Sequence, residues 1–445
     1  MIKNRIETLL RPFLKSEEDK SKLFTVILPS FVVRSGYFLL AYLTQIALTR
    51  MLGPSRYGVF VYTGTIIFLL MNFSSYGFEV LALRFTSTYL SENKMALWKG
   101  LYKWSLRMLV IIGTTVAAGT ALYLWVSVYW LRFMAETPYT LPILVSCSII
   151  PIYTLMNFYG NLLRGQNKLV ISFLPDNTIK PFFLLLSLVA LRLILGQMNL
   201  YLAIALNLVS FIVAFAFVVA IFQKGNHTKE IKAEYDKPMW RKVIGSLFVL
   251  TCVGTLHGRI DTIMLRYLKD SSQVGIYYLA ERDASALFFF QYIMSIIISP
   301  SIARLNILTE KDKLQKLISR MVRWVMLFSL PAFAIIVLFS KPIILLSGGE
   351  FLPGQTALII ICIGHIIDVA FGPVLSFVLM TGYEKYNTIA MGLGIVMNVV
   401  LNLLLTPRMG ITGTAIAAAS STVFWNLYLF IIIYRKTGIR TWILG

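Results

Sequence analysis

The chain has 445 residues, of which 58% are hydrophobic and only 14% are charged, and its mean hydropathy is +0.76. This composition excludes an ordinary soluble domain and is typical of a multi-pass membrane protein. The formal net charge of +21 has a simple explanation in basic loops on the inner side of a membrane, so we expect no nucleic-acid partner.

The first apolar segment, residues 23–48, follows a polar and basic stretch, and no small-residue cleavage site comes after it. We therefore expect a retained transmembrane helix and not a signal peptide. At about 1.5 Å per residue, Arg34 lies near the middle of the bilayer. A guanidinium at this depth is costly unless protein, water or a counter-charge surrounds it, which makes Arg34 a candidate functional residue in a polar bundle interior.

Twelve apolar segments follow one another along the chain, each long enough to cross the roughly 30 Å hydrocarbon core as a helix. Their approximate bounds are 23–48, 57–83, 105–130, 141–163, 169–195, 200–222, 241–265, 274–303, 321–346, 356–380, 386–406 and 411–434. The sequence thus predicts an all-α protein with twelve transmembrane helices.

The loops are short, and no stretch outside the segments is long enough for a separate domain. Residues 224–240 are predicted to be a cytoplasmic linker between an N-terminal six-helix lobe, residues 1–223, and a C-terminal six-helix lobe, residues 241–445. Residues 304–323 carry apolar side chains at helical spacing, which indicates an amphipathic helix on the inner surface that continues into the ninth segment.

Two motifs recur along the chain at nearly one offset, which indicates a duplication. The stretch 50–58, RMLGPSRYG, resembles 266–275, RYLKDSSQVG, at an offset of 216 or 217, and LxGxxK at 163–168 recurs as MxGxxK at 380–385. An even number of helices per copy gives both copies the same orientation, so the lobes should be related by a pseudo-two-fold axis along the membrane normal. We expect substrate to bind between them.

Lysine and arginine set the orientation. With the N-terminus in the cytoplasm, most of the 41 Lys and Arg residues fall on the inner side, as the positive-inside rule requires. Both termini are therefore predicted to be cytoplasmic, in the inner or plasma membrane.

Three ionisable side chains are predicted near the midplane, namely Arg34, Lys180 and Asp368. The two cations favour a phosphate or pyrophosphate ligand, because Arg offers a bidentate fork and Lys a point charge. Pairing of Lys180 with Asp176, one turn earlier, is the structural alternative. Asp368, with His365 one turn before it, is a candidate for ion coupling, and a satisfied buried carboxyl is its alternative.

Other embedded charges lie toward the outer ends of their segments. Arg259 with Asp261, and the run Glu281-Arg282-Asp283, are interpreted as structural pairs or snorkelling side chains. The acids Glu281 and Asp283 are alternatively candidates for ion coupling.

No feature of the sequence predicts a cofactor. The three cysteines, Cys147, Cys252 and Cys362, lie in apolar runs without ligand spacing, so we expect neither a metal site nor a disulfide. No GxxxxGK[ST] loop is present, and we expect no ATP hydrolysis.

Several short motifs resemble a known family in the same order along nearly the whole chain. They are LGPSRYGVF at 52–60, RIDTIML at 259–265, VGIY at 274–277, TGYEK at 381–385 and NVVLNLLLTPRMGITGTA at 398–415. The pattern is similar to the polysaccharide transporter family of Wzx-type flippases, within the multidrug/oligosaccharidyl-lipid/polysaccharide exporter (MOP) superfamily.

The resemblance implies two six-helix lobes around a cavity that opens alternately to each side. It implies export of an undecaprenyl-pyrophosphate-linked oligosaccharide, such as an O-antigen repeat unit, with Arg34, Lys180 and Arg259 in the pyrophosphate and sugar cavity. Membrane lipids and other polysaccharide-assembly proteins are the implied partners. The second half departs from a uniformly basic cavity, because its embedded acids outnumber its arginines, and ion coupling through Asp368, Glu281 and Asp283 is the alternative use of those acids.

Two other functions compete with the flippase. A cation-coupled multidrug antiporter of the same superfamily would favour an acidic site, and the deep Arg34 argues against it. A membrane-embedded glycosyltransferase or polymerase would need catalytic residues in sizeable outer loops, which this chain lacks, so we expect no enzyme.

Overall fold

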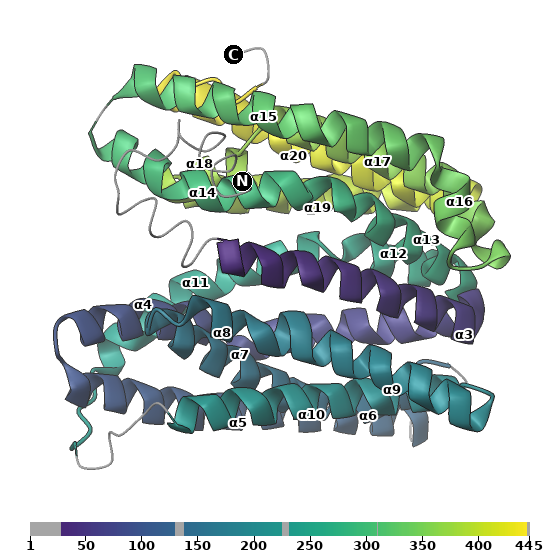
Figure 1. Cartoon of the computed structure of the whole chain (residues 1–445), viewed down its shortest axis with the longest axis horizontal. Coiled ribbons are helices and arrows are strands. Elements are labelled where there is room, and N and C mark those ends of the chain that lie inside the picture. Colours follow the sequence, from purple (N-terminus) through teal and green to yellow (C-terminus); the bar gives the residue numbers. More distant parts are fainter. Residues whose placement is uncertain (1–27, 130–137, 225–230, 309, 443–445) are drawn as a thin grey trace, which may run out of the picture.

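The computed structural model describes residues 28–129, 138–224, 231–308 and 310–442, and within these ranges it contains helices and no strand (Figure 1). The side chains of a few residues inside the helices, including that of Arg34, lie outside this description. The predicted all-α class is confirmed.

The helices form an upper and a lower layer in Figure 1, and between them lie α3 (Leu28–Ser75), α11 (Lys237–His257), α12 (Ile260–Leu268) and α13 (Ser271–Ala284). We call the lower layer together with α3 (Leu28–Ser75) the first lobe. The lower layer contains α4 (Phe78–Ser91), α5 (Met95–Tyr129), α6 (Thr140–Ser146), α7 (Ile149–Gly165), α8 (Leu169–Leu174), the π-helix η2 (Pro175–Ile179), α9 (Lys180–Leu195) and α10 (Leu200–Lys224).

The second lobe contains the upper layer and the elements that join it to α3. They are α12 (Ile260–Leu268), α13 (Ser271–Ala284), η3 (Ser285–Leu287), α14 (Phe288–Ile307), α15 (Lys311–Leu338), α16 (Ser340–Leu345), η4 (Gly349–Gly354), α17 (Gln355–Phe371), α18 (Val374–Thr381), α19 (Glu384–Met409) and α20 (Ile411–Thr437). The remaining helix, α11 (Lys237–His257), leads from one lobe to the other.

Among the described residues, eight helices are long and apolar enough to cross a membrane, or nine if the bent pair α6 and α7 forms one span. The chain is thus a multi-pass membrane protein, as predicted, and the number of twelve spans stays a prediction. One of these helices, α3, contains most of two predicted segments, 23–48 and 57–83, because Gly53 interrupts it with φ 68° and ψ 172°. Figure 1 shows the dark purple part of α3 running to the right-hand end and its lighter continuation returning beneath it.

Buried side chains form three apolar cores. One lies inside the first lobe, one inside the second lobe, and one joins α3, α9 and α10 to α13 and α17. Trp240 and Ile244, on the first turns of α11, belong to the first-lobe core and are 0% and 3% exposed. The beginning of α11 is therefore packed on the first lobe, while its later part leads to α12 in the second.

The two lobes meet tightly at one end of the molecule, which we call the closed end. There a Cβ atom on Gly58 would lie 1.7 Å from the carbonyl oxygen of Ser271, and one on Gly275 would lie 2.3 Å from that of Pro54. The hydroxyl oxygens of Ser55 and Ser271 are 3.1 Å apart. Only glycine permits this backbone contact between α3 and α13, since any side chain would overlap the opposite chain.

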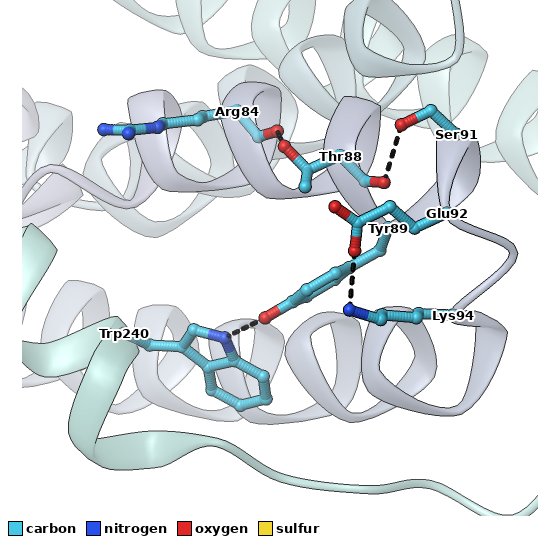
Figure 2. Close-up of polar contacts among 7 residues, drawn as sticks. All are labelled: Arg84, Thr88, Tyr89, Ser91, Glu92, Lys94 and Trp240. Carbon is cyan, nitrogen blue, oxygen red and sulfur yellow. Dashed lines mark hydrogen bonds and ion pairs between the residues drawn. The ribbon is translucent and has the colours of Figure 1, made fainter.

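At the opposite end, which we call the linker end, residues 231–240 pack on α4 and α5. The indole of Trp240 donates to the hydroxyl of Tyr89 at 2.9 Å, and Figure 2 shows the two side chains pointing toward each other. Lys99 donates to the carbonyl of Ile231 at 2.6 Å, and the backbone N–H of Glu234 donates to Ala96 at 3.0 Å. The linker is thus attached to the first lobe.

Candidate functional site

A cavity of about 340 Å³ lies where α3, α7, η2, α9 and α10 of the first lobe face α12 and α13 of the second. Its polar and aromatic lining includes Tyr37, Gln45, Tyr153, Asp176, Lys180, Asn207, Arg259, Tyr278 and Arg282. The structure therefore brings two predicted site residues, Lys180 and Arg259, to the same space between the lobes.

A π-helical turn positions Lys180. The N–H of Lys180 donates to the carbonyl of Pro175 five residues earlier, as in a π-helix, and Pro181 after it has no backbone N–H to donate. The ammonium lies 2.5 Å from a carboxylate oxygen of Asp176 and 4.6 Å from the ring centre of Phe211. The predicted structural alternative, pairing with Asp176, is thus present, and the pair lies on the cavity wall.

A break between α11 and α12 positions Arg259. It precedes the first residue of α12 with a non-helical φ of −133°, next to Gly258. Its guanidinium carbon lies 5.0 Å from the ring of Phe68 on α3 and 5.8 Å from that of Tyr278 on α13. Cation–π contacts of this kind hold the charge between the lobes without neutralising it.

Arg282 is a cavity residue that the sequence analysis assigned to structural pairing. It extends from α13 toward Tyr37 on α3, with its guanidinium carbon 5.9 Å from the ring and a nitrogen 3.4 Å from the hydroxyl. Among the described residues, no carboxylate lies within 4 Å of the guanidinium of Arg259 or of Arg282. Both arginines can therefore offer hydrogen-bond donors to an anion.

A second cavity of about 400 Å³ adjoins the first and shares Phe68, Arg259, Tyr278 and Arg282 with it. Glu281 lines this second space. The two arginines thus stand at the junction of both cavities, with Lys180 and Asp176 on one side and Glu281 on the other.

The other predicted site residues lie as follows. Arg34 is on α3, about one helical turn before Tyr37, and its side chain lies outside the described residues, so its role stays a prediction. Asp283 lies behind the main cavity and accepts from the side chain of Gln45 at 2.8 Å across the two lobes. Asp368 is on α17 beside Asn426 and lines neither cavity.

Asp261 belongs to a buried polar network that the sequence analysis missed. Its carboxylate accepts from the amide of Asn398 at 2.8 Å and that of Asn402 at 3.4 Å, both on α19. Thr406 donates to Asn402 at 2.8 Å and lies 3.0 Å from Thr414 on α20. The signal was available in the i, i+4 spacing of Asn398, Asn402 and Thr406, which places all three on one helix face.

No group of three or more His, Cys, Asp or Glu side chains in the described ranges is arranged to hold a metal ion. The cysteines are free, with Cys147 and Cys362 buried and Cys252 partly buried. The site is therefore best described as a polar, arginine-bearing cavity within a membrane bundle.

Comparison with known proteins places this architecture in a family. The sequence profile of the Polysaccharide biosynthesis protein family matches residues 27–305, which is more than half of the chain. The chain belongs to this family. The resemblance to the polysaccharide transporter family of Wzx-type flippases is confirmed.

Solved structures with the same fold are MOP-superfamily transporters. An inward-facing multidrug resistance MATE family transporter superposes with a TM-score of 0.74 at 13% identity, covering 92% of this chain and 98% of the other. The lipid II flippase MurJ in an inward closed conformation superposes with a TM-score of 0.68 at 13% identity, covering 92% and 87%. At these identities the likeness establishes the fold.

A curated relative is the probable low-salt glycan biosynthesis flippase Agl15 of Haloferax volcanii, 27% identical over 172 residues. This alignment spans 38% of the present chain and about a third of the relative's length, 36%. The chain is thus a multi-pass membrane protein of the Polysaccharide biosynthesis protein family, with the fold that these transporters share.

Proposed function

We propose that this protein flips an undecaprenyl-pyrophosphate-linked oligosaccharide, such as an O-antigen or other surface polysaccharide repeat unit, across the inner membrane. The observation that carries the proposal is the cavity between the lobes, where Arg259 and Arg282 have aromatic but no carboxylate partners within the described chain. A pyrophosphate presents oxygens that match two guanidinium forks.

The remaining lining suits a sugar. Tyr37, Tyr153 and Tyr278 offer rings and hydroxyls, and Gln45 and Asn207 offer amides. Each sugar hydroxyl would lose its water in lipid at a cost of several kcal/mol, and polar side chains replace part of that hydration. The polyprenyl tail stays in the lipid while the head group passes through the cavity.

The proposed cycle is alternating access without covalent chemistry, so the protein is not an enzyme in this account and uses no ATP. The proposed lobes are residues 1–223 and 241–445, joined by 224–240. With both termini cytoplasmic, the linker end faces the cytoplasm and the closed end faces outward, so the cavity loads from the cytoplasm. Energy comes from the membrane potential, about 2.3 kcal/mol per charge at 100 mV, or from an ion gradient.

Individual residues have separate roles in this proposal. Arg259 and Arg282 hold the pyrophosphate from the second lobe, and Lys180 with Arg34 does so from the first. Glu281, Asp283 and Asp368 are the candidate coupling residues, and Glu281 lines the second of the two cavities described above. Membrane lipids and other polysaccharide-assembly proteins are the expected partners.

Mass spectrometry of lipid-linked oligosaccharides in cells that lack the protein tests the proposal. We expect one complete undecaprenyl-linked unit to accumulate, and the wild-type gene to relieve this accumulation. The Arg34→Ala variant should relieve it poorly if it reaches the membrane. An unchanged lipid pool in cells lacking the protein would reject the flippase function.

The second candidate is a cation-coupled multidrug antiporter, favoured by the buried acid of the second lobe, Asp261, with its amide partners Asn398 and Asn402. Carboxylates suit cationic drugs, whereas arginines in the cavity repel them. Drug sensitivity of the same cells separates the two functions, because an antiporter changes it and leaves the lipid-linked pool unaltered.

A further inference from the structure

One exposed face of α15 changes from cationic to apolar along its length. Lys316, Arg320 and Arg323 are exposed on this face, and Leu327 and Leu330 continue it with 60% and 48% of their surface exposed. The spacings of four, three, four and three residues keep all five on one side of the helix. The opposite side, including Leu314, Ile318 and Met321, is buried in the second-lobe core. The amphipathic helix predicted over residues 304–323 is present from Lys311 onward, since residues up to Ile307 belong to α14, and it packs its apolar side on protein.

The cationic part of this face is hollowed into a groove of about 440 Å³, which we call the α15 groove. It is lined by Gln315, Lys316, Ser319, Arg320, Arg323 and Trp324. Gln315 is held in place because its amide donates to the carbonyl of Arg440 at 2.8 Å and accepts from the N–H of Arg440 at 2.8 Å. The groove lies along α15, and Gln315 in its wall is anchored to the backbone of the C-terminal segment.

Its three cations have no carboxylate partner within the part of the chain that the structure describes. The ion pairs found there involve Lys94, Lys180 and Lys313 and none of the groove residues. Three like charges within two helical turns repel one another, so an anion in the groove would be stabilised.

The level of the groove matches that of lipid head groups. The apolar span of α15 follows directly after Trp324, a residue type enriched where a helix enters the bilayer. Cations therefore lie at head-group height, and Leu327 and Leu330 lie one and two turns deeper on the same face. This order of charge and apolar surface matches that of a phospholipid.

The equivalent place in the first lobe is occupied by the chain itself. Lys99 and Lys103 on α5 precede Lys316 and Arg320 by the repeat offset of 217. The ammonium of Lys99 donates to the carbonyl of Ile231, so the linker covers this position. The position equivalent to Lys316 thus has a polar partner in the first lobe, whereas Lys316 itself lines an open groove.

We propose that the α15 groove binds the phosphate head group of an anionic phospholipid, with the acyl chains along Leu327 and Leu330. Anionic lipid is enriched in the cytoplasmic leaflet, and each nearby Lys or Arg strengthens its binding. The linker end has this leaflet beside it in the orientation proposed above, and the groove lies outside the central cavity.

Native mass spectrometry of the purified full chain, titrated with phosphatidylglycerol, tests the assignment. The variant Lys316→Gln, Arg320→Gln, Arg323→Gln should bind the lipid at least about tenfold more weakly, at low ionic strength. The matched control is Lys103→Gln, Arg107→Gln, which removes exposed cations from α5, and its affinity should equal that of the wild type.

If the triple variant does not fold, single variants test the same proposal. Arg320→Gln and Arg323→Gln should each weaken binding about fivefold, and Arg320→Lys should retain it, because charge is kept. Equal binding of phosphatidylcholine, loss in the α5 control, or full displacement by millimolar inorganic phosphate would overturn the assignment to an anionic lipid.

Discussion

Gly58 and Gly275 meet backbone to backbone across the interface of the two lobes, and their positions differ by the offset of 217 that relates the two copies of the sequence. The contact is reciprocal, since Gly58 approaches Ser271 and Gly275 approaches Pro54, which is itself 217 residues before Ser271. Reciprocal contacts between equivalent residues are typical of a two-fold interface. The predicted pseudo-two-fold axis would pass close to this pair, which joins the lobes at the closed end.

The variant Gly58→Val should separate the lobes at the closed end. A side chain here would overlap the carbonyl of Ser271, and overpacking of this kind costs about 1–3 kcal/mol. The measurement is disulfide formation between Ser55→Cys and Ser271→Cys, whose hydroxyl oxygens are 3.1 Å apart, in a chain whose native cysteines are replaced by alanine.

We expect rapid cross-linking with glycine at position 58 and slow cross-linking with valine. Gly119→Val is the control, because a Cβ there meets nothing within 4 Å. Equal rates in Gly58→Val and the control would show that this contact does not hold the lobes together.

Replacing Arg282 should weaken binding of the pyrophosphate head group. Hydrogen bonds to a charged partner contribute about 1.5–3 kcal/mol, so Arg282→Gln should lose roughly tenfold or more in affinity for undecaprenyl pyrophosphate. Arg282→Lys should lose less, because it keeps the charge without the planar fork. Titration of the purified protein measures both, with exposed Lys341→Gln as the control, and unchanged affinity in Arg282→Gln would remove this residue from the site.

The hydrogen bond between Trp240 and Tyr89 should stabilise the attachment of the linker to the first lobe. Trp240→Phe and Tyr89→Phe each remove one partner of the 2.9 Å bond, at a cost of about 0.5–1.5 kcal/mol. Thermal unfolding in detergent measures the change in the free energy of unfolding. The loss in the double variant should be smaller than the sum of the losses in the two single variants. Strict additivity would mean that the bond contributes nothing.

Removing the amide of Asn398 should lower the free energy of unfolding more than neutralising its partner, Asp261. Asn398→Ala leaves the buried carboxylate of Asp261 with one long contact, to Asn402, and an under-satisfied buried acceptor costs about 1–3 kcal/mol. Asp261→Asn removes the charge and keeps the shape, so its effect on unfolding should be smaller. The reverse order would show that the charge itself stabilises the network, through an ion or another partner.

The sequence was sufficient for the parts of the fold that depend on local pattern. Long apolar runs predicted membrane helices, and two weak motifs predicted a duplication whose proposed copies each contribute one glycine to the contact of Gly58 with Gly275. Depth along the helix placed Lys180 near the midplane, and i, i+4 spacing gave pairing with Asp176 as its structural alternative, which the structure contains.

Local sequence patterns did not predict how each helix is rotated about its axis or which side chains pair over long sequence distances. The sequence shows the charged run Glu281-Arg282-Asp283 within an apolar segment. Which of its side chains faces Tyr37 depends on how α13 packs on α3. Asp261 was paired with its sequence neighbour Arg259, whereas its partner Asn398 is 137 residues away. Contacts of this range are set by tertiary packing, and no local pattern in one sequence specifies them.

The most direct test of the central claim is head-group translocation in proteoliposomes loaded with an undecaprenyl-pyrophosphate-linked oligosaccharide on one leaflet. A membrane-impermeant lectin reports arrival of the sugar on the other leaflet. We predict transport by the wild type and by Lys341→Gln, and a loss of at least about tenfold in the double variant Arg259→Gln, Arg282→Gln. Translocation by the double variant at the wild-type rate, or none by the wild type above protein-free vesicles, would contradict the account.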